Sequence, residues 1–195
     1  EGKYDPFDDT KVENINKEEV FSEPKRLKLI AQHIIDNHDR KTNNRRYNAL
    51  FAVANIKKLI AYYNIFKELN TDLRISAIFT YEENEDLEFK QEHSKDSLEK
   101  IITDYNKMYN TNYHVTTFPA FASDLMKKIK TAQIDIVIVV GMMLTVFDAK
   151  VLNTLYVDKN LEYHNLLQAY SRTNRVEHTT KPFGNIVCYR NLKTK

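Results

Sequence analysis

The sequence is poor in glycine and cysteine: 3 of its 195 residues are glycine and one is cysteine, with four prolines and no tryptophan. Gly2, Gly141 and Gly184 precede no Lys-Ser or Lys-Thr pair, which excludes a phosphate-binding P-loop within this sequence. The single cysteine, Cys188, has no partner for an internal disulfide, and this fits a reducing compartment. We therefore expect a cytoplasmic protein without the main loop that binds a nucleoside triphosphate.

Long apolar runs and metal-ligand patterns are also missing. No stretch reaches the roughly 18 consecutive apolar residues that a membrane span needs, and the first ten residues are acidic rather than signal-like. The six histidines show no metal-ligand spacing, so we predict no metal site. Asp135 precedes its candidate strand, whereas a magnesium-binding acid of the Walker B type follows one, so we predict a loop residue there. Glu88-Phe89-Lys90 matches the end of a nuclease motif, but without an evident strand we interpret it as coincidence.

Charge is distributed unevenly along the chain. The net charge is +2, yet residues 1–21 carry 7 acids and 3 bases, and residues 81–100 carry 8 acids and 3 bases. The other 154 residues therefore carry a charge of +11. A basic body suits a polyanion such as nucleic acid, although many basic domains bind none.

The hydrophobic content of 42% is normal for one globular domain. We predict an N-terminal arm or linker from a preceding domain at 1–21 and one domain at 22–195, with an acidic insertion at about 81–100. The first helix should begin at Ser22, a capping residue, with Pro24 in its first turn.

Strand and helix patterns alternate through the domain. Strand candidates are 47–54, 73–80, 134–140, 154–157 and 185–189, and helix candidates are 22–37, 57–69, 94–108, 121–130 and 162–174. The Ile/Val run at 134–140 indicates burial on both faces, which is typical of parallel sheets. We therefore predict an α/β three-layer domain with a mainly parallel central sheet and ligand sites at the carboxyl ends of its strands.

The segment 168–175 has the most informative spacing. In a helix, Gln168, Arg172 and Arg175 fall within about 60° of one another, roughly opposite the apolar face of Tyr163, Leu166, Leu167 and Tyr170. The polar stripe contains no acid, and unpaired guanidinium groups suit a phosphate. A solvated polar stripe is the alternative, and it is the commoner meaning of two arginines on a helix.

These eight residues resemble motif VI of superfamily 2 helicases. Residues 141–149 resemble motif V, and residues 47–55 motif IV, of the motor (R) subunit of type I restriction-modification enzymes. The segments 152–159 and 183–187 continue the pattern of that family. The resemblance runs from about Phe21 to the C-terminus and includes the acidic insertion.

The resemblance implies the second RecA-like lobe of an ATP-dependent double-stranded DNA translocase. ATP and Mg²⁺ would bind mainly on the first lobe of the same parent chain, so this fragment alone would be inactive. The full-length parent would be a type I site-specific deoxyribonuclease in the bacterial or archaeal cytoplasm. Its partners would be double-stranded DNA and the modification and specificity subunits.

The resemblance also implies catalytic and nucleotide-binding roles. Arg172 and Arg175 would be arginine fingers at the γ-phosphate of ATP, and Gln168 would help sense that phosphate. Asp148 would lie near the nucleotide, at or close to the ribose, and Gly141 would be a further nucleotide-binding position.

Two further residues would face the nucleic acid. Thr145 and Asn55 would contact phosphates without reading sequence, but for Asn55 a helix cap before Ile56 is an equally strong alternative. The chain departs from the family at Val146, where glycine is usual, and at Ala54, where a hydroxyl is usual. Val146 favours a second hypothesis, a helicase-like domain that serves mainly as a DNA or protein docking module. A third, a free-standing nucleotide-binding enzyme, conflicts with the missing P-loop.

Overall fold

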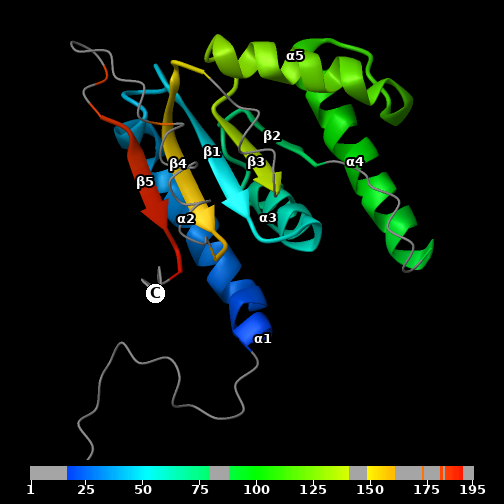
Figure 1. The fold of residues 1–195 in the computed structure, drawn as a ribbon, viewed down its shortest axis with the longest axis horizontal. Coiled ribbons are helices and arrows are strands. Elements are labelled where there is room, and N and C mark those ends of the chain that lie inside the picture. The colour runs from blue at the N-terminus through cyan, green and yellow to red at the C-terminus, as the bar shows by residue number, and fades with distance from the viewer. Residues whose placement is uncertain are drawn as a thin grey trace, which may run out of the picture.

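The computed structural model describes residues 17–79, 88–140, 149–160 and 183–190, together with the single residues 173 and 181. Five strands form one sheet in the order β2-β3-β1-β4-β5, and every neighbouring pair is parallel. The strands are β1 (Asn48–Val53), β2 (Ile75–Ile78), β3 (Ile136–Val140), β4 (Leu152–Asp158) and β5 (Asn185–Cys188). Their carboxyl ends therefore share one edge of the sheet, toward which the arrowheads point in Figure 1.

Helices flank the sheet. They are α1 (Lys17–Ser22), α2 (Pro24–Lys41), α3 (Ile56–Glu68), α4 (Glu88–Tyr109) and α5 (Phe118–Lys130), with a short 3-10 turn at Val115–Thr117. α2 and α3 pack together behind the sheet in Figure 1, and α4 and α5 lie on the side of β2 and β3. The crossovers β1-α3-β2 and β2-α4-α5-β3 run in opposite directions along the sheet, so right-handed connections place their helices on opposite faces. The predicted α/β fold with a mainly parallel central sheet is confirmed.

The core lies along the central strands. Every residue of β1 and β4 is buried, and Leu50, Phe51, Ile138 and Leu155 are fully inaccessible. A strand that is covered on both faces has no solvent side for polar residues, and this explains the unbroken apolar run of β3.

The N-cap of the first long helix lies one position later than the sequence suggested. Ser22 was predicted to cap it, but Ser22 ends α1, and the carboxylate of Glu23 accepts the backbone N–H of Arg26 at 2.9 Å. The reason is Pro24: a proline ring disfavours helical dihedrals at the preceding residue, so Glu23 is extended and becomes the cap. The short helix α1 occupies the last residues of the predicted arm.

The acidic insertion is helical in its second half. We predicted a loop followed by a helix from near residue 94, but α4 already begins at Glu88. Leu98, Ile101 and Tyr105 are buried at helical spacing, and the helix extends from that packed part toward its N-terminus. The sequence Glu88-Phe89-Lys90 lies in this helix rather than beside a strand, so the expected context of a nuclease motif is missing there. Residues 80–87 lie outside the described residues.

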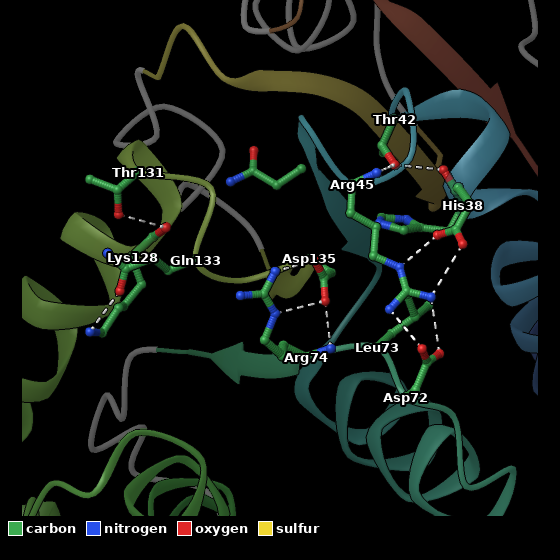
Figure 2. A network of polar contacts seen from close by, with 12 residues as sticks. His38, Thr42, Arg45, Asp72, Leu73, Arg74, Lys128, Thr131, Gln133 and Asp135 are labelled. Atoms are coloured by element: carbon green, nitrogen blue, oxygen red, sulfur yellow. Dashed lines mark hydrogen bonds and ion pairs between the residues drawn. The ribbon is translucent and has the colours of Figure 1, made fainter.

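Paired charges hold the amino edge of the sheet (Figure 2). Arg45 binds Asp39 at 2.7 Å and Asp72 at 2.8 Å, and this links the end of α2 to the turn before β2. Asp135 is 1% exposed and accepts three bonds from Arg74, two from the guanidinium and one from the backbone N–H. Asp135 is therefore a loop residue before β3, as predicted, and its carboxylate ties the starts of β2 and β3 together.

A buried histidine beside this network makes stability depend on pH. His38 is fully inaccessible, and neither ring nitrogen has a hydrogen-bond partner among the described residues. Burial lowers the pKa of His38 to about 4, and the carboxylates of Asp135 and Asp39 oppose this shift only in part. Between pH 6.5 and pH 4 the unfolded chain therefore binds a proton that the folded chain excludes. The free energy of unfolding falls as pH drops through this window, by up to about 3 kcal/mol.

We expect His38→Leu to remove most of this loss of stability, because leucine has a similar volume and no titrating group. The measurement is urea unfolding of the chain at several pH values between 4 and 7. His114→Leu, at an exposed position, is the control and should keep the parent's slope of stability against pH. An unchanged slope in His38→Leu would contradict the assignment.

Candidate functional site

The carboxyl edge of the sheet is where parallel α/β folds bind ligands. The strands end there at Val53, Ile78, Val140, Asp158 and Cys188. Six predicted site residues lie outside the described residues, and their roles stay predictions: Gly141, Thr145, Asp148, Gln168, Arg172 and Arg175.

Asn55, the remaining predicted residue, follows β1 at this edge. Its backbone is extended, and its side-chain Oδ1 accepts the backbone N–H of Lys58 at 2.9 Å, so it caps α3. This confirms the helix-cap alternative. The cap uses Oδ1. The Nδ2 group of this exposed residue could therefore donate a hydrogen bond to a phosphate oxygen. The contact with nucleic acid stays a prediction.

One residue of the motif VI segment is described, and it is tightly packed. Thr173 is helical and 2% exposed. A Cβ atom added to Gly184 would come within 2.5 Å of the Cβ, Oγ1 and carbonyl oxygen of Thr173. Only glycine allows this approach of the two backbones without a shift. The segment that enters β5 is therefore pressed against Thr173.

Helical spacing relates Thr173 to the predicted site residues of its segment. In a helix, Thr173 lies about 20° from Leu166 and about 100° or more from Gln168, Arg172 and Arg175. Its burial agrees with the apolar face that the sequence assigns to packing. Helical spacing then predicts that the glutamine and both arginines turn away from the packed side.

A second cluster at this edge surrounds the buried carboxylate of Asp158. Arg26 donates to it through both terminal nitrogens, at 2.7 and 3.1 Å. Tyr62 donates its hydroxyl at 2.7 Å and Arg190 its Nε at 3.0 Å. Burial alone would raise the pKa of Asp158, but hydrogen bonds from Arg26, Tyr62 and Arg190 outweigh it and lower the pKa. Removing one partner of such a buried pair typically costs about 3–5 kcal/mol.

Two arginines of the Asp158 cluster pair with its carboxylate. Arg26 and Arg190 both bind Asp158, and Lys58, 3% exposed, lies on the adjacent first turn of α3. Lys159, directly after Asp158, is partly buried, and burial lowers its pKa. Sequence reasoning missed this cluster. An aspartate at the end of an apolar run indicates a buried carboxylate that needs a positively charged partner. The sequence alone does not show which lysine or arginine is that partner.

In the described part of the chain, no group of three or more histidine, cysteine or acidic side chains is placed to hold a metal ion. The described helices also include none that is both long and apolar enough to cross a bilayer. A pocket of about 530 Å³ lies between α3 and α4, lined by residues such as Tyr63, Lys67 and Asp104, and no predicted site residue lines it.

Comparison with known proteins gives consistent matches. The family model described as type I restriction enzyme subunit R domain 3 matches residues 45–191. The chain is 51% identical, over 95% of its length, to the endonuclease subunit of the type I restriction enzyme SauCOLORF180P of Staphylococcus aureus (strain COL), of which it covers 21%. It is 31% identical, over 89% of its length, to a putative type I restriction endonuclease subunit of Methanocaldococcus jannaschii, of which it covers 16%. Among solved structures, Mss116p DEAD-box helicase domain 2 bound to an RNA duplex matches with a TM-score of 0.47 and 13% identity, over 85% of this chain and 51% of that one.

Two substitutions at Asn55 separate the helix cap from a phosphate contact. Asn55→Asp keeps an oxygen cap, so stability should stay within about 0.5 kcal/mol of the parent, while Asn55→Ala should cost about 1 kcal/mol. If Nδ2 also contacts DNA phosphates, Asn55→Asp should weaken DNA binding by the full-length subunit, because it replaces a donor by a negative charge. Chemical unfolding and DNA titration measure the two effects. Unchanged DNA affinity in Asn55→Asp would exclude the phosphate contact.

We expect Gly184→Ala to destabilise the domain by about 1–3 kcal/mol, because the added methyl group overpacks against Thr173. Thermal or urea unfolding measures the change. Phe183→Ala is the neighbouring control: Phe183 is 64% exposed, so this change should stay within about 0.5 kcal/mol of the parent. Equal stability of Gly184→Ala and the parent would contradict the close packing of Gly184 on Thr173.

Proposed function

Since the chain belongs to the family of type I restriction enzyme subunit R domain 3, we propose that it is the second motor lobe of an ATP-driven DNA translocase. It spans about a fifth of the length of its staphylococcal relatives, so the activity belongs to a longer parent. That parent would move double-stranded DNA and cut it, in complex with modification and specificity subunits.

Within this proposal the lobe completes a nucleotide site that it does not form alone. ATP and Mg²⁺ would bind mainly on the first lobe, and the metal would neutralise charge on the phosphates. Arg172 and Arg175 would reach across to the γ-phosphate as that charge develops. Gln168 would sense the phosphate, and Asp148 and Gly141 would lie near the nucleotide.

The packing of Thr173 on Gly184 carries this proposal. Thr173 is buried and helical, and it packs on Gly184. If the helix continues through the segment, helical spacing would put Arg172 and Arg175 on the opposite side. Arginines on an anchored segment lose little further freedom when they bind a phosphate, and pre-organised charges are the ones that stabilise a transition state well.

The basic carboxyl edge supports the DNA and nucleotide partners. Arg26 and Arg190 both bind the carboxylate of Asp158 on this side of the sheet, so these three described groups together carry one excess positive charge. Their field attracts polyanions without reading sequence. Asn55 and Thr145 would add neutral contacts to phosphates beside it.

Arg175→Ala in the full-length subunit tests the finger assignment. We expect the DNA-stimulated ATPase rate to fall by about 10³-fold or more, because arginine fingers contribute at least that much to phosphoryl transfer. Steady-state phosphate release with saturating DNA is the measurement. The control is Arg40→Ala. Arg40 is exposed near the end of α2 at the amino edge, and within the described part of the chain its side chain bonds Asn37, so activity should stay at the parent level.

Retained ATPase activity in Arg175→Ala would remove the catalytic role and leave a docking module as the better explanation. Mixing this domain with its first lobe gives a second test. A DNA-stimulated ATPase that needs both pieces supports the motor, while DNA binding without any ATPase supports the docking module.

A further inference from the structure

Four cations lie along the amino edge of the sheet, at the opposite end of the strands from the predicted nucleotide site. Each is either the last residue of a helix or two residues before a strand. They are Lys41 at the end of α2, Lys130 at the end of α5, Arg46 before β1 and Lys150 before β4. Lys41 is half-buried and the other three are exposed. We call these four side chains the amino-edge row.

Hydrogen bonds to the backbone bring the four positions together. Asn48, at the start of β1, donates its Nδ2 to the carbonyl of Ile129 at 2.7 Å and its backbone N–H to the carbonyl of Val151 at 3.0 Å. Each of these carbonyls belongs to the neighbour of a lysine of the row. The Nδ2 group of Asn185 donates to the carbonyl of Lys41 at 3.0 Å. The row therefore follows the strand starts from β3 to β5, a span of about 14 Å at the usual spacing of strands.

Three acids beside the row are already paired. Arg45 binds Asp39 and Asp72 at 2.7 and 2.8 Å, and Arg74 binds Asp135 at 2.8 Å (Figure 2). Within the described residues, no acidic side chain forms an ion pair with a cation of the row. The charge of the row is thus left for a partner.

The turn before β1 holds an unusual backbone conformation. Asn43, Asn44 and Arg45 follow one another with φ of 54°, 53° and 62°, in the left-handed region that residues with a Cβ atom disfavour. The backbone N–H of Arg46 donates to the carbonyl of Asn43 at 3.2 Å, and Arg45 ties the turn to two carboxylates. Such backbone persists only where its surroundings over-determine it, and it gathers at binding sites. The turn thus keeps Arg46 beside two exposed asparagines in one backbone geometry.

The chemistry of the row favours phosphates over a protein surface. Lysine is depleted from protein interfaces, whereas lysine and arginine make many of the contacts to phosphate oxygens that position a protein on DNA. The neutral neighbours Asn43, Asn44 and Thr131 are exposed hydrogen-bonding side chains of the kind that join such contacts. Duplex DNA carries one negative charge about every 1.7 Å along its axis, so a row of about 14 Å faces several phosphates.

We propose that the amino-edge row is a second binding surface for the phosphate backbone of double-stranded DNA. A strand of seven residues, the length of β4, puts the row about 23 Å from the carboxyl edge. The row therefore contacts a part of the DNA that does not lie on that edge. It raises the affinity for DNA of any sequence and takes no part in phosphoryl transfer. This inference rests on the proposed function for its partner, double-stranded DNA.

Lys130→Gln/Lys150→Gln in the full-length subunit by itself tests the proposal. Glutamine keeps a polar side chain at both positions and removes two charges. We expect the affinity for a duplex to fall roughly tenfold or more at about 0.1 M salt, because two phosphate contacts are lost. The slope of log affinity against log salt should become smaller by about 2, because fewer counterions are released. Fluorescence titration of a labelled duplex over a salt series measures both.

Lys95→Gln/Lys100→Gln is the matched control, because it removes the same charge from two exposed lysines of α4. Its DNA affinity should stay within about twofold of the parent, since charges away from the contact are screened. All four lysines are exposed, so both variants should keep the parent's fold, which circular dichroism checks.

Two outcomes would overturn the proposal. An equal loss of affinity in both variants would show that net charge alone matters. Unchanged affinity and slope in Lys130→Gln/Lys150→Gln would show that the row does not bind DNA. If that variant then assembles less well with the modification and specificity subunits, the row is a protein interface instead.

ATPase assays separate this inference from the proposed function. At saturating DNA, Lys130→Gln/Lys150→Gln should keep the parent's kcat, while the DNA concentration for half-maximal stimulation rises roughly tenfold. If Arg175→Ala keeps its ATPase activity while the row variant loses DNA affinity, the motor assignment fails and the DNA surface stands. If Arg175→Ala loses activity and the row variant binds DNA like the parent, the motor stands and the DNA surface fails.

Discussion

The parallel pairing of β1 with both β3 and β4 is the constraint on which the rest of the structure depends. Parallel neighbours need a crossover, and right-handed crossovers in two directions place helices on both faces. Covered faces explain why β1 and β4 are buried throughout. The same pairing brings every strand's carboxyl end to one edge, where Asn55 and Asp158 both lie although they are far apart in the sequence.

The two edges of this sheet use charge differently. At the amino edge, Arg74 is matched by Asp135, and Arg45 lies between two acids (Figure 2), so these charges hold elements together. At the carboxyl edge, Asp158 is shared by two arginines. The first arrangement links neighbouring elements, and the second places two arginines on one buried acid.

Local patterns predicted the elements well where one physical effect dominates. The Ile/Val run before Val140 predicted a buried parallel strand because only strands covered on both faces tolerate it. The cap at Asn55 was among the expectations because a short polar side chain before a helix satisfies a free N–H. The predicted cap at Ser22 was wrong because Pro24 disfavours helical dihedrals at Glu23, and this effect outweighs the capping preference of serine. The extension of α4 back to Glu88 was missed because its acidic first turns carry no apolar pattern.

By itself the sequence determined the fold class, the absence of a P-loop, and the spacing of Gln168, Arg172 and Arg175, since each depends on residues close together in the chain. Only the tertiary structure decided which charges meet. Arg26 and Asp158 are 132 positions apart, and of the 29 lysines and arginines any could have served as partner. Likewise, only the structure shows why residue 184 has to be glycine, because Thr173 packs against it and leaves no space for a side chain. Helical and strand periods are local properties, whereas the pairing of buried charges depends on which segments the parallel sheet brings to the same edge.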